Sequence, residues 1–188
     1  LKVMAGYSYQ YNKYSGLKAN NKDFPNDALE DNNLGSGTFA KDEGEVDMGS
    51  YMNDNKLIAF FGRVSYDWKG RYMMTASLRH EGSSKFGKNY KWGNFPAVSF
   101  GWRISDEPFM QETKSWLTDL KLRADYGVTG NQNFDSYKSL NTMSGFGYYI
   151  YNGKYYQVWG PGKNVNPNLR WEKGKNWNIG LDWTLFGG

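Results

Sequence analysis

Alternation of apolar with small or charged residues constrains the fold of this chain more than any other feature. Between residues 97 and 104, for example, the even-numbered positions hold Val98, Phe100 and Trp102, and the odd-numbered positions hold small or charged residues. Successive side chains of a β-strand point to opposite faces, so this pattern predicts strands with one apolar face. In residues 120–129 the same face is predicted to hold Ala124 and Val128. The pattern recurs in six segments: 1–11, 57–68, 71–80, 92–104, 120–129 and 175–186.

The lengths of these segments and of their connections favour a transmembrane β-barrel. Each segment has about ten residues, the length that a tilted strand needs to cross a bilayer and nearly twice that of an ordinary strand. If the strands run up and down, the tight turn at 67–71 and the 105–119 connection lie at one end. The longer connections, 12–56, 80–91 and 130–174, lie at the other end. Outer-membrane barrels have this combination of short turns on one side and long loops on the other.

Aromatic residues are unusually frequent, since they make up 18% of a chain in which only 39% of residues are apolar. Membrane barrels carry such rings in two belts, one at each bilayer surface. The up-and-down arrangement predicts one belt at the short-turn end, formed by Trp68, Tyr72, Trp102 and Trp183. It predicts a second belt toward the long-loop end, formed by Tyr9, Tyr11, Trp92, Tyr126 and Trp177.

A soluble, aromatic-rich glycan-binding β-sheet is the alternative interpretation, because a β-sandwich would bury the same apolar face against a second sheet. Six strands cannot close a transmembrane barrel, which needs at least eight, so the barrel interpretation requires strands beyond those predicted here. A membrane-spanning helix is not expected, because the longest apolar run covers only residues 57–61 whereas such a helix needs about 20 apolar residues.

Four sequence blocks resemble consecutive signature blocks of the SusC/RagA-type TonB-dependent transporters of the bacterial outer membrane. They are RYMMTASLRHEGSSKFG (71–87), KWGNFPAVSFGWRISDEPFM (91–110), WLTDLKLRADYGVTGNQ (116–132) and NPNLRWEKGKNWNIGLDW (166–183). The resemblance implies an all-β fold whose long antiparallel strands form part of a 22-stranded transmembrane barrel. It also implies import of oligosaccharides or peptides, a SusD-like surface lipoprotein as partner, and the TonB complex acting through a plug region. Residues 1–188 are expected to be an interior part of the barrel domain without that plug.

No catalytic or cofactor-binding set is predicted. The chain has no cysteine, and its single histidine, His80, is expected to be structural at the end of a strand. Asp106 and Glu107 are explained more simply as the first turn of a short helix within 105–119, with Ser105 as its N-cap, than as an acid/base pair. The net charge of +4 is spread along the chain and forms no basic arm, so nucleic acid is not an expected partner.

Binding is expected from the loops. The segment 145–160 is rich in aromatic side chains that lie beside glycine and asparagine. Such rings suit stacking on sugars or contact with peptides, and the candidates are Tyr148, Tyr149, Tyr155, Tyr156 and Trp159. The competing interpretation is a self-packed hairpin that turns at Asn152 and Gly153 and extends the barrel wall. Residues 12–54 are expected to form a mobile loop that serves as a lip or a lid.

The face opposite the apolar one carries a basic set. Its members are Arg63, Arg71, Arg79, Arg103, Lys121 and Arg123. Inside a barrel these residues are expected to line the lumen, where they contact the plug or polar cargo. Alternatively, they form ion pairs with nearby carboxylates such as Asp125 and Asp182.

Overall fold

The computed structural model describes residues 1–28, 33–37, 47–162 and 165–187. The chain divides into two compact units, one formed by residues 1–10 and 56–188 and the other by residues 11–55. The larger unit contains most of the sheet and all of the loop-end core. None of the described helices is long or apolar enough to cross a membrane.

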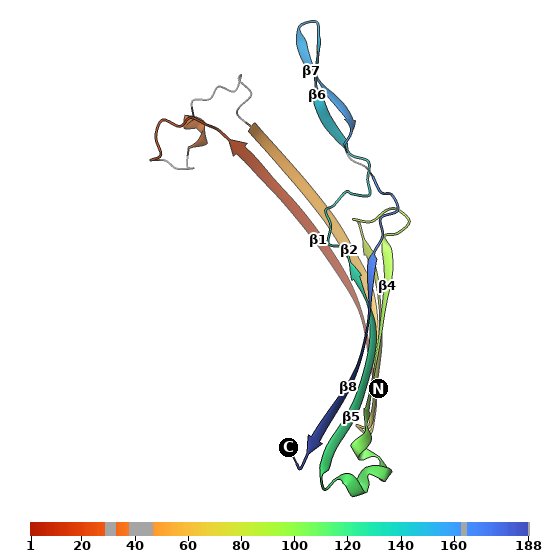
Figure 1. Ribbon diagram of the computed structural model, residues 1–188. Coiled ribbons are helices and arrows are strands. Elements are labelled where there is room, and N and C mark those ends of the chain that lie inside the picture. Colours follow the sequence, from red (N-terminus) through yellow and green to blue (C-terminus); the bar gives the residue numbers. More distant parts are fainter. Residues whose placement is uncertain (29–32, 38–46, 163–164, 188) are drawn as a thin grey trace. The chain divides into compact units, whose positions relative to one another are not determined.

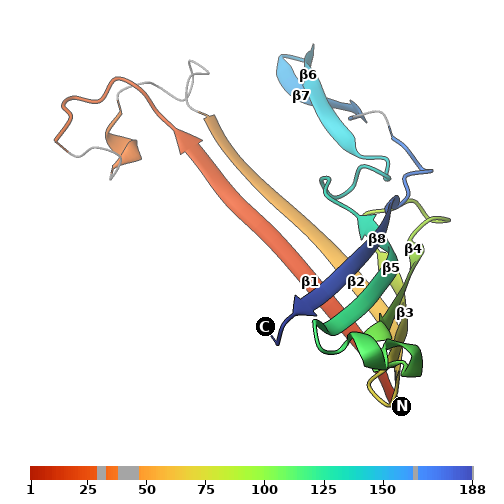
Figure 2. The ribbon, with the colours of Figure 1, turned by 60° about the horizontal axis from the view of Figure 1, so that its bottom comes forward.

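One six-stranded sheet dominates the structure, in the order β1-β2-β3-β4-β5-β8. Each strand is followed in the sheet by the next along the chain, except that β8 takes the place beside β5. Strands β3, β4, β5 and β8 run side by side in two views (Figures 1 and 2). The bounds are β1 Lys2–Asn20, β2 Asp47–Trp68, β3 Tyr72–Ser83, β4 Trp92–Arg103, β5 Leu117–Asn131 and β8 Glu172–Leu185.

The tight turn between β2 and β3 follows from its sequence, DWKGR. Lys69 and Gly70 both have positive φ, 56° and 67°, as the two central residues of a type I′ hairpin turn require. The Gly70 amide donates to Asp67 Oδ1 at 2.8 Å, and the Arg71 amide donates to the Trp68 carbonyl at 3.0 Å. This turn fixes the β2–β3 register, in which Trp68 lies opposite Tyr72.

The connection between β4 and β5 is helical as expected, but the single short helix is replaced by two short segments. It contains two 3-10 segments, η3 (Ile104–Asp106) and η4 (Pro108–Thr113). Glu107 between them is extended (φ −76°, ψ 147°), because a residue that precedes proline avoids the helical region. Ser105 is not an N-cap: it is buried within η3, and its hydroxyl donates to Asp119 Oδ1 at 3.0 Å. The N-terminus of the chain lies at this end of the sheet (Figure 2).

Two further strands, β6 (Met143–Tyr151) and β7 (Lys154–Pro161), form a separate antiparallel hairpin. The hairpin turns at Asn152 and Gly153, whose φ angles of 51° and 73° match a type I′ turn. The turn therefore lies where the Asn-Gly pair predicts it. The register shifts between Gly145 and Tyr148, which indicates a bulge in β6.

The smaller unit corrects the expectation of a mobile loop over residues 12–54. Residues 11–20 continue β1, and residues 47–55 belong to β2, so the two strands extend well beyond the predicted boundaries. Asn12 Nδ2 donates to Asn55 Oδ1 at 3.0 Å. Asn21 Nδ2 holds the 3-10 turn η1 (Leu34–Ser36) by donating to the Leu34 carbonyl at 2.9 Å. The remainder of the predicted lip or lid, at 29–32 and 38–46, lies outside the described residues.

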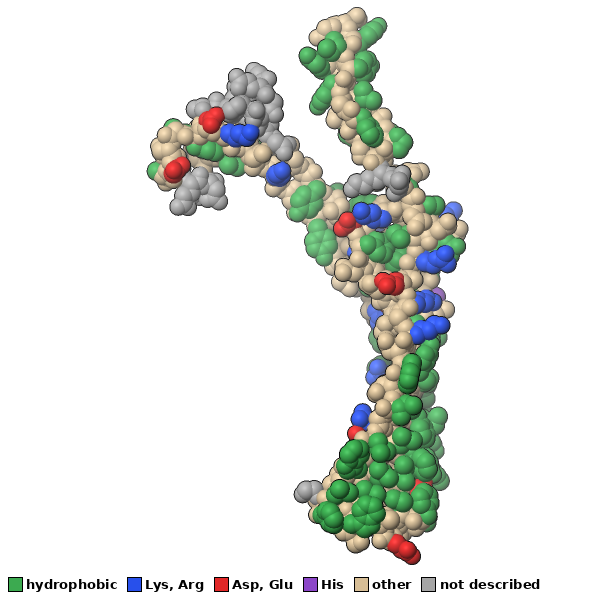
Figure 3. Space-filling model, in the orientation of Figure 1, with side chains coloured by type: hydrophobic (Ala, Val, Ile, Leu, Met, Phe, Trp, Pro, Cys, Tyr) green, Lys and Arg blue, Asp and Glu red, His purple; other side chains and the backbone are tan. Residues whose placement is uncertain are grey.

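The buried core of the larger unit is small and lies at the loop end. Phe86, Phe95 and Trp171 are at most 8% exposed, and they form one cluster. Many large apolar side chains of the sheet are instead exposed, and Figure 3 shows such side chains gathered over the end near η3 and η4 and over the β6–β7 hairpin. Within the described residues, no second sheet covers the apolar face of β2–β5 and β8.

Candidate functional site

Stacked rings cross the apolar face of the sheet near the short turns. Trp68, Tyr72 and Trp102 lie on neighbouring strands, with ring centroids 5.6 and 6.3 Å apart and interplanar angles of 22° and 13°. Trp183 lies on β8 opposite Leu120. The register thus joins three of the four rings predicted for this end into one continuous row.

A second group of rings occupies the loop end of the same face. Tyr7 lies 5.2 Å from Phe60, and Phe60 lies 6.4 Å from Trp92. The His80 ring stacks on Trp92 at 4.6 Å with an interplanar angle of 4°, and His80 Nδ1 is 2.6 Å from Asn94 Oδ1. His80 is therefore a member of an aromatic row, and the described residues contain no cluster of His, Cys, Asp and Glu that could hold a metal ion.

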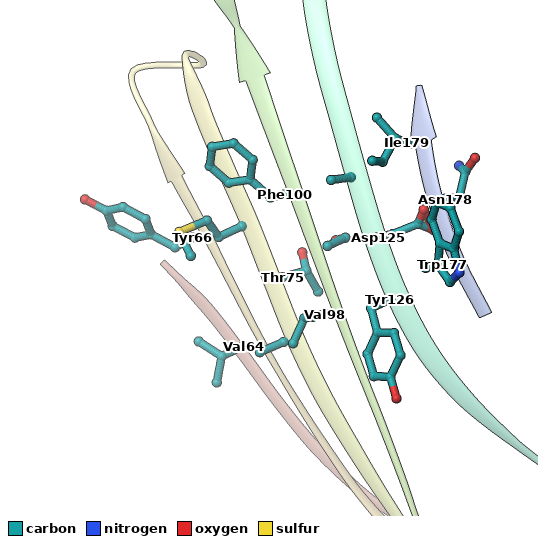
Figure 4. Close-up of a pocket in the computed structure, with 14 residues that line it drawn as sticks. Val64, Tyr66, Thr75, Val98, Phe100, Asp125, Tyr126, Trp177, Asn178 and Ile179 are labelled. Carbon is teal, nitrogen blue, oxygen red and sulfur yellow. The ribbon is translucent and has the colours of Figure 1, made fainter. Parts of the chain in front are cut away.

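Between the two groups of rings, the apolar face has a shallow hollow of about 610 Å³. Ala76 and Ala124 line it together with larger side chains. Figure 4 shows three of these, Val98, Phe100 and Tyr126. Tyr126 and Trp177 line it and pair with each other across β5 and β8, so the register places them in the row of Val98. The hollow is mostly apolar and open, and Asp125 is the one charged residue among those that line it.

The opposite face of the sheet holds the basic set, mostly in ion pairs. Arg79 binds Glu81 through two contacts of 2.8 Å, and Arg123 binds Asp182 at 2.7 and 2.8 Å. Arg103 Nε lies 3.4 Å from Asp119 Oδ1. Ion pairing, one of the two expectations for the basic set, therefore describes these three arginines. Such half-exposed pairs contribute little stability each, about 1 kcal/mol or less.

Of the other three members of the basic set, Arg71 pairs with Glu107 at 3.2 Å, and the last two have no such partner among the described residues. Neither Arg63 nor Lys121 forms an ion pair with a described residue. Lys121 lines a small polar hollow of about 260 Å³ together with Arg123, Asp125 and Asn178. This hollow lies on the charged face and is the part of the wall best suited to contact a polar group.

Glu107 anchors the short-turn end of the sheet, a role that the sequence pattern did not reveal. Its carboxylate accepts hydrogen bonds from the Tyr72 hydroxyl, from Trp102 Nε1 at 3.0 Å and from Arg71 Nη1 at 3.2 Å. The Tyr72 bond is the largest effect that lowers the pKa of Glu107, and the Trp102 and Arg71 contacts lower it further, against the opposing effect of desolvation. Glu107 therefore ties the η3–η4 segment to the ring row on β3 and β4.

The loop-end core is the second feature that the alternation did not predict. Phe86 lies 4.6 Å from Trp171 and 5.2 Å from Phe134, and Phe95 lies 5.1 Å from Trp171. Trp171 Nε1 donates to the Lys91 carbonyl at 3.0 Å, so the buried indole is satisfied. The blocks GSSKFG and NPNLRWE, which supply Phe86 and Trp171, were the only sequence signal for this contact.

The β6–β7 hairpin carries all five rings predicted to bind cargo. Tyr148 and Tyr155 are 67% and 73% exposed, and Trp159 is 58% exposed. Tyr149 and Tyr156 stack with their centroids 5.5 Å apart on one side of the hairpin. The hairpin interpretation is thus correct about the turn, yet the rings are not buried by self-packing. By strand alternation Tyr148, Tyr155 and Trp159 lie on one face of the hairpin, and Tyr149 and Tyr156 lie on the other. The aromatic surface of the hairpin therefore consists of exposed rings on both of its faces.

Long antiparallel strands with tight turns at one end, ring rows on one face and charges on the other are the features of a β-barrel wall. The sequence model described as "TonB dependent receptor-like, beta-barrel" matches residues 2–188. This chain belongs to the TonB-dependent receptor β-barrel family, whose members are bacterial outer-membrane proteins.

Two curated relatives illustrate the similarity. The chain is 38% identical over 143 residues to the TonB-dependent receptor SusC of Bacteroides thetaiotaomicron, which covers 74% of this chain and 14% of that protein. It is 37% identical over 187 residues to the TonB-dependent receptor P39 of Formosa agariphila, which covers 97% of this chain and 17% of that protein. The chain therefore spans less than a fifth of the length of these relatives.

Solved structures agree with this fold. A structure of the RagAB peptide transporter superposes with a TM-score of 0.77 at 26% identity, covering 98% of this chain and 20% of that chain. The RagAB peptide importer in its "closed-closed" state superposes with a TM-score of 0.76 at 24% identity, a likeness that shows the fold alone. The strands of this chain thus follow the wall of a larger receptor.

Proposed function

We propose that this chain forms part of the wall of an outer-membrane importer that takes up oligosaccharides or peptides. In this proposal the apolar face contacts lipid, the charged face lines the lumen, and the β6–β7 hairpin contacts cargo. The observation that carries the proposal is the hairpin itself, whose large rings are exposed on a strongly anchored base. Rings of this kind stack on sugars or hold peptides at low entropic cost.

The proposed lipid contact is supported by the two groups of rings on the apolar face. Eight residues separate Tyr72 from His80 along β3, and ten separate Trp102 from Trp92 along β4. At about 3.3 Å per residue and a strand tilt of about 40°, these intervals correspond to a band of roughly 20–25 Å. This height is close to the apolar band of about 25 Å on known membrane barrels.

The proposed partners follow from the family. A SusD-like lipoprotein would deliver cargo at the loop end, and the TonB complex would supply energy through a plug region that lies outside residues 1–188. One relative is named for SusC, and the solved structures are those of a RagAB peptide transporter. RagAB is named as a peptide transporter, whereas oligosaccharide cargo rests on the sequence resemblance alone, so both classes are to be tested.

The cargo surface is tested by substituting Tyr155→Ala, Tyr156→Ala and Trp159→Ala together in the full-length receptor, expressed with its neighbouring lipoprotein. Uptake is measured with fluorescently labelled maltoheptaose and, separately, with a labelled tryptic casein digest. We expect uptake of one probe to fall about tenfold or more. The matched control is Phe109→Ala with Trp116→Ala, which removes exposed rings (66% and 49% exposed) at the opposite end of the sheet.

Unchanged uptake in the triple variant would refute the hairpin as a cargo surface. Fractionation tests the membrane part separately, because an importer wall must sediment with outer membranes and require detergent for extraction. Recovery of the receptor as a soluble protein without detergent would instead favour a soluble glycan-binding sheet.

A further inference from the structure

Both ends of the β6–β7 hairpin attach to one loop of the sheet, residues 84–91 between β3 and β4. The chain reaches the hairpin through an outgoing leg, residues 132–142, and leaves it through a returning leg, described at residue 162 and over residues 165–171. The two legs contact each other through the Gly162 amide and the Thr142 carbonyl at 2.7 Å, and through the Asn166 amide and the Lys138 carbonyl at 3.3 Å. Each leg also forms hydrogen bonds with the β3–β4 loop.

Lys85 holds the outgoing leg. Its ammonium donates to the Phe134 carbonyl at 2.7 Å and to the Gln132 carbonyl at 3.4 Å. The same ammonium lies 5.7 Å from the centre of the Phe134 ring, within the range of a cation–π contact. The Ser139 hydroxyl returns a hydrogen bond to the Lys85 carbonyl at 3.1 Å. One lysine therefore restrains this leg at three residues.

Gly87 holds the returning leg. Its amide donates to the Leu169 carbonyl at 3.0 Å, and the backbone approaches so closely that a Cβ at Gly87 would overlap the carbonyl oxygen of Pro167. The Gly87 φ is not in the left-handed region, so close approach, not backbone conformation, is the reason for glycine here. Between the two clamping residues, Phe86 is 1% exposed and packs on Trp171.

We propose that Lys85 and Gly87 are positioning residues of the receptor: together they clamp both legs of the hairpin, so the β3–β4 loop sets where the aromatic surface stands. The proposal rests on the cargo-binding role proposed above for that surface. The hairpin's own ladder of hydrogen bonds joins β6 only to β7, so it fixes the shape of the hairpin but not its direction. The direction of the hairpin depends on its two legs. Lys85 fixes the outgoing leg and Gly87 fixes the returning leg, and both residues are adjacent to Phe86 in the sequence.

The clamp predicts that removal of the Lys85 ammonium widens the range of hairpin orientations. In Lys85→Met, the Gln132 and Phe134 carbonyls lose their charged donor, while the aliphatic stem keeps its packing. The matched control is Lys88→Met, which removes the same charge from an exposed position in the same loop. The chain has no cysteine, so spin labels can be placed through Lys154→Cys on the hairpin and Leu78→Cys on the wall.

Distances between the two labels are measured by pulsed electron paramagnetic resonance in the full-length receptor, in a background without other cysteines. We expect a narrow distribution in the parent and in Lys88→Met, and a distribution at least about twice as wide in Lys85→Met. Gly87→Ala is the second variant, and it is expected to shift the mean distance because the returning leg must move. Gly62→Ala is its control, since a Cβ there meets only ordinary contacts at 3.8 Å.

Cargo binding provides the second measurement, with whichever of the two labelled probes the parent receptor imports. We expect the half-saturation concentration to rise about tenfold in Lys85→Met with little change in the maximal rate, because the binding surface is intact but less preorganised. Unchanged label distributions in both variants would overturn the clamp. Wider distributions with unchanged half-saturation would keep the clamp and refute the hairpin as the cargo surface.

Discussion

The Trp171 indole lies 4.6 Å from the Phe86 ring, although the two residues lie far apart in the sequence. This contact joins the loop after β3 to the segment before β8. It is the centre of the only described cluster of buried apolar side chains. The stability of the loop end therefore depends on very few residues.

Loss of the Phe86 ring should destabilise the barrel more than loss of any exposed ring. Because the side chain is 1% exposed, Phe86→Ala removes buried apolar area and leaves a cavity, and we expect the free energy of unfolding to fall by about 3–5 kcal/mol. Urea unfolding of the refolded full-length receptor measures this change. Phe109→Ala, at a position 66% exposed, should change it by about 0.5 kcal/mol or less. Equal losses in the two variants would contradict the importance of this core.

Acidification should weaken the short-turn end through Glu107. The folded-state pKa of this carboxyl is lowered by the Tyr72, Trp102 and Arg71 contacts, so its stabilising effect is fully present above the ordinary carboxyl pKa. The effect is lost as the pH falls through the lowered pKa, when the folded state must also take up a proton. Glu107→Gln should flatten the dependence of the unfolding midpoint on pH as the pH falls below the ordinary carboxyl pKa.

The control for Glu107 is Asp106→Asn, which removes a carboxylate from the same turn without removing the acceptor of these three donors. Unfolding midpoints in urea, measured across the pH series, compare the two variants. Identical pH profiles for Glu107→Gln and the parent would show that the anchor does not contribute.

Two adjacent residues of β4 provide a test of which face meets lipid. Val98 is 51% exposed on the apolar face, and Ser99 is exposed on the charged face. Val98→Arg should destabilise the membrane-inserted receptor by about 2–4 kcal/mol, because it places a charge in hydrocarbon, and it should reduce assembly into outer membranes. Ser99→Arg should have a much smaller effect. If Ser99→Arg were the more damaging of the two, the proposed orientation of the wall would be reversed.

Alternation predicts the strands well where the two faces have different surroundings. It fails over residues 12–20 and 47–54, which are strands although polar residues occupy both parities. A strand that has water on both faces needs no apolar side, so period-two analysis cannot detect it. The strand ends beyond the predicted band are therefore the part of the fold that sequence periodicity misses.

Contacts between loops are invisible to the same analysis. Val128 keeps the parity of Tyr126 along β5, yet it follows the last β4–β5 pair, Ala97 with Gly127, and packs against the Phe86, Phe95 and Trp171 cluster. Parity describes one strand at a time and carries no information on which distant loop folds over its end. The rings of the hairpin, by contrast, were found from composition and from the Asn152–Gly153 turn, both of which are local signals.

The closure of the two legs by the Gly162–Thr142 hydrogen bond has a consequence for how such a receptor can change. Among the described residues, the contacts that anchor the legs to the sheet lie before Thr142 or after Gly162, and the hairpin between them has its own ladder and its own turn. Exchange of that insert for one of different length or chemistry leaves the anchoring contacts in place. A hairpin with different recognition residues can thus replace this one without changes to the barrel wall that carries it.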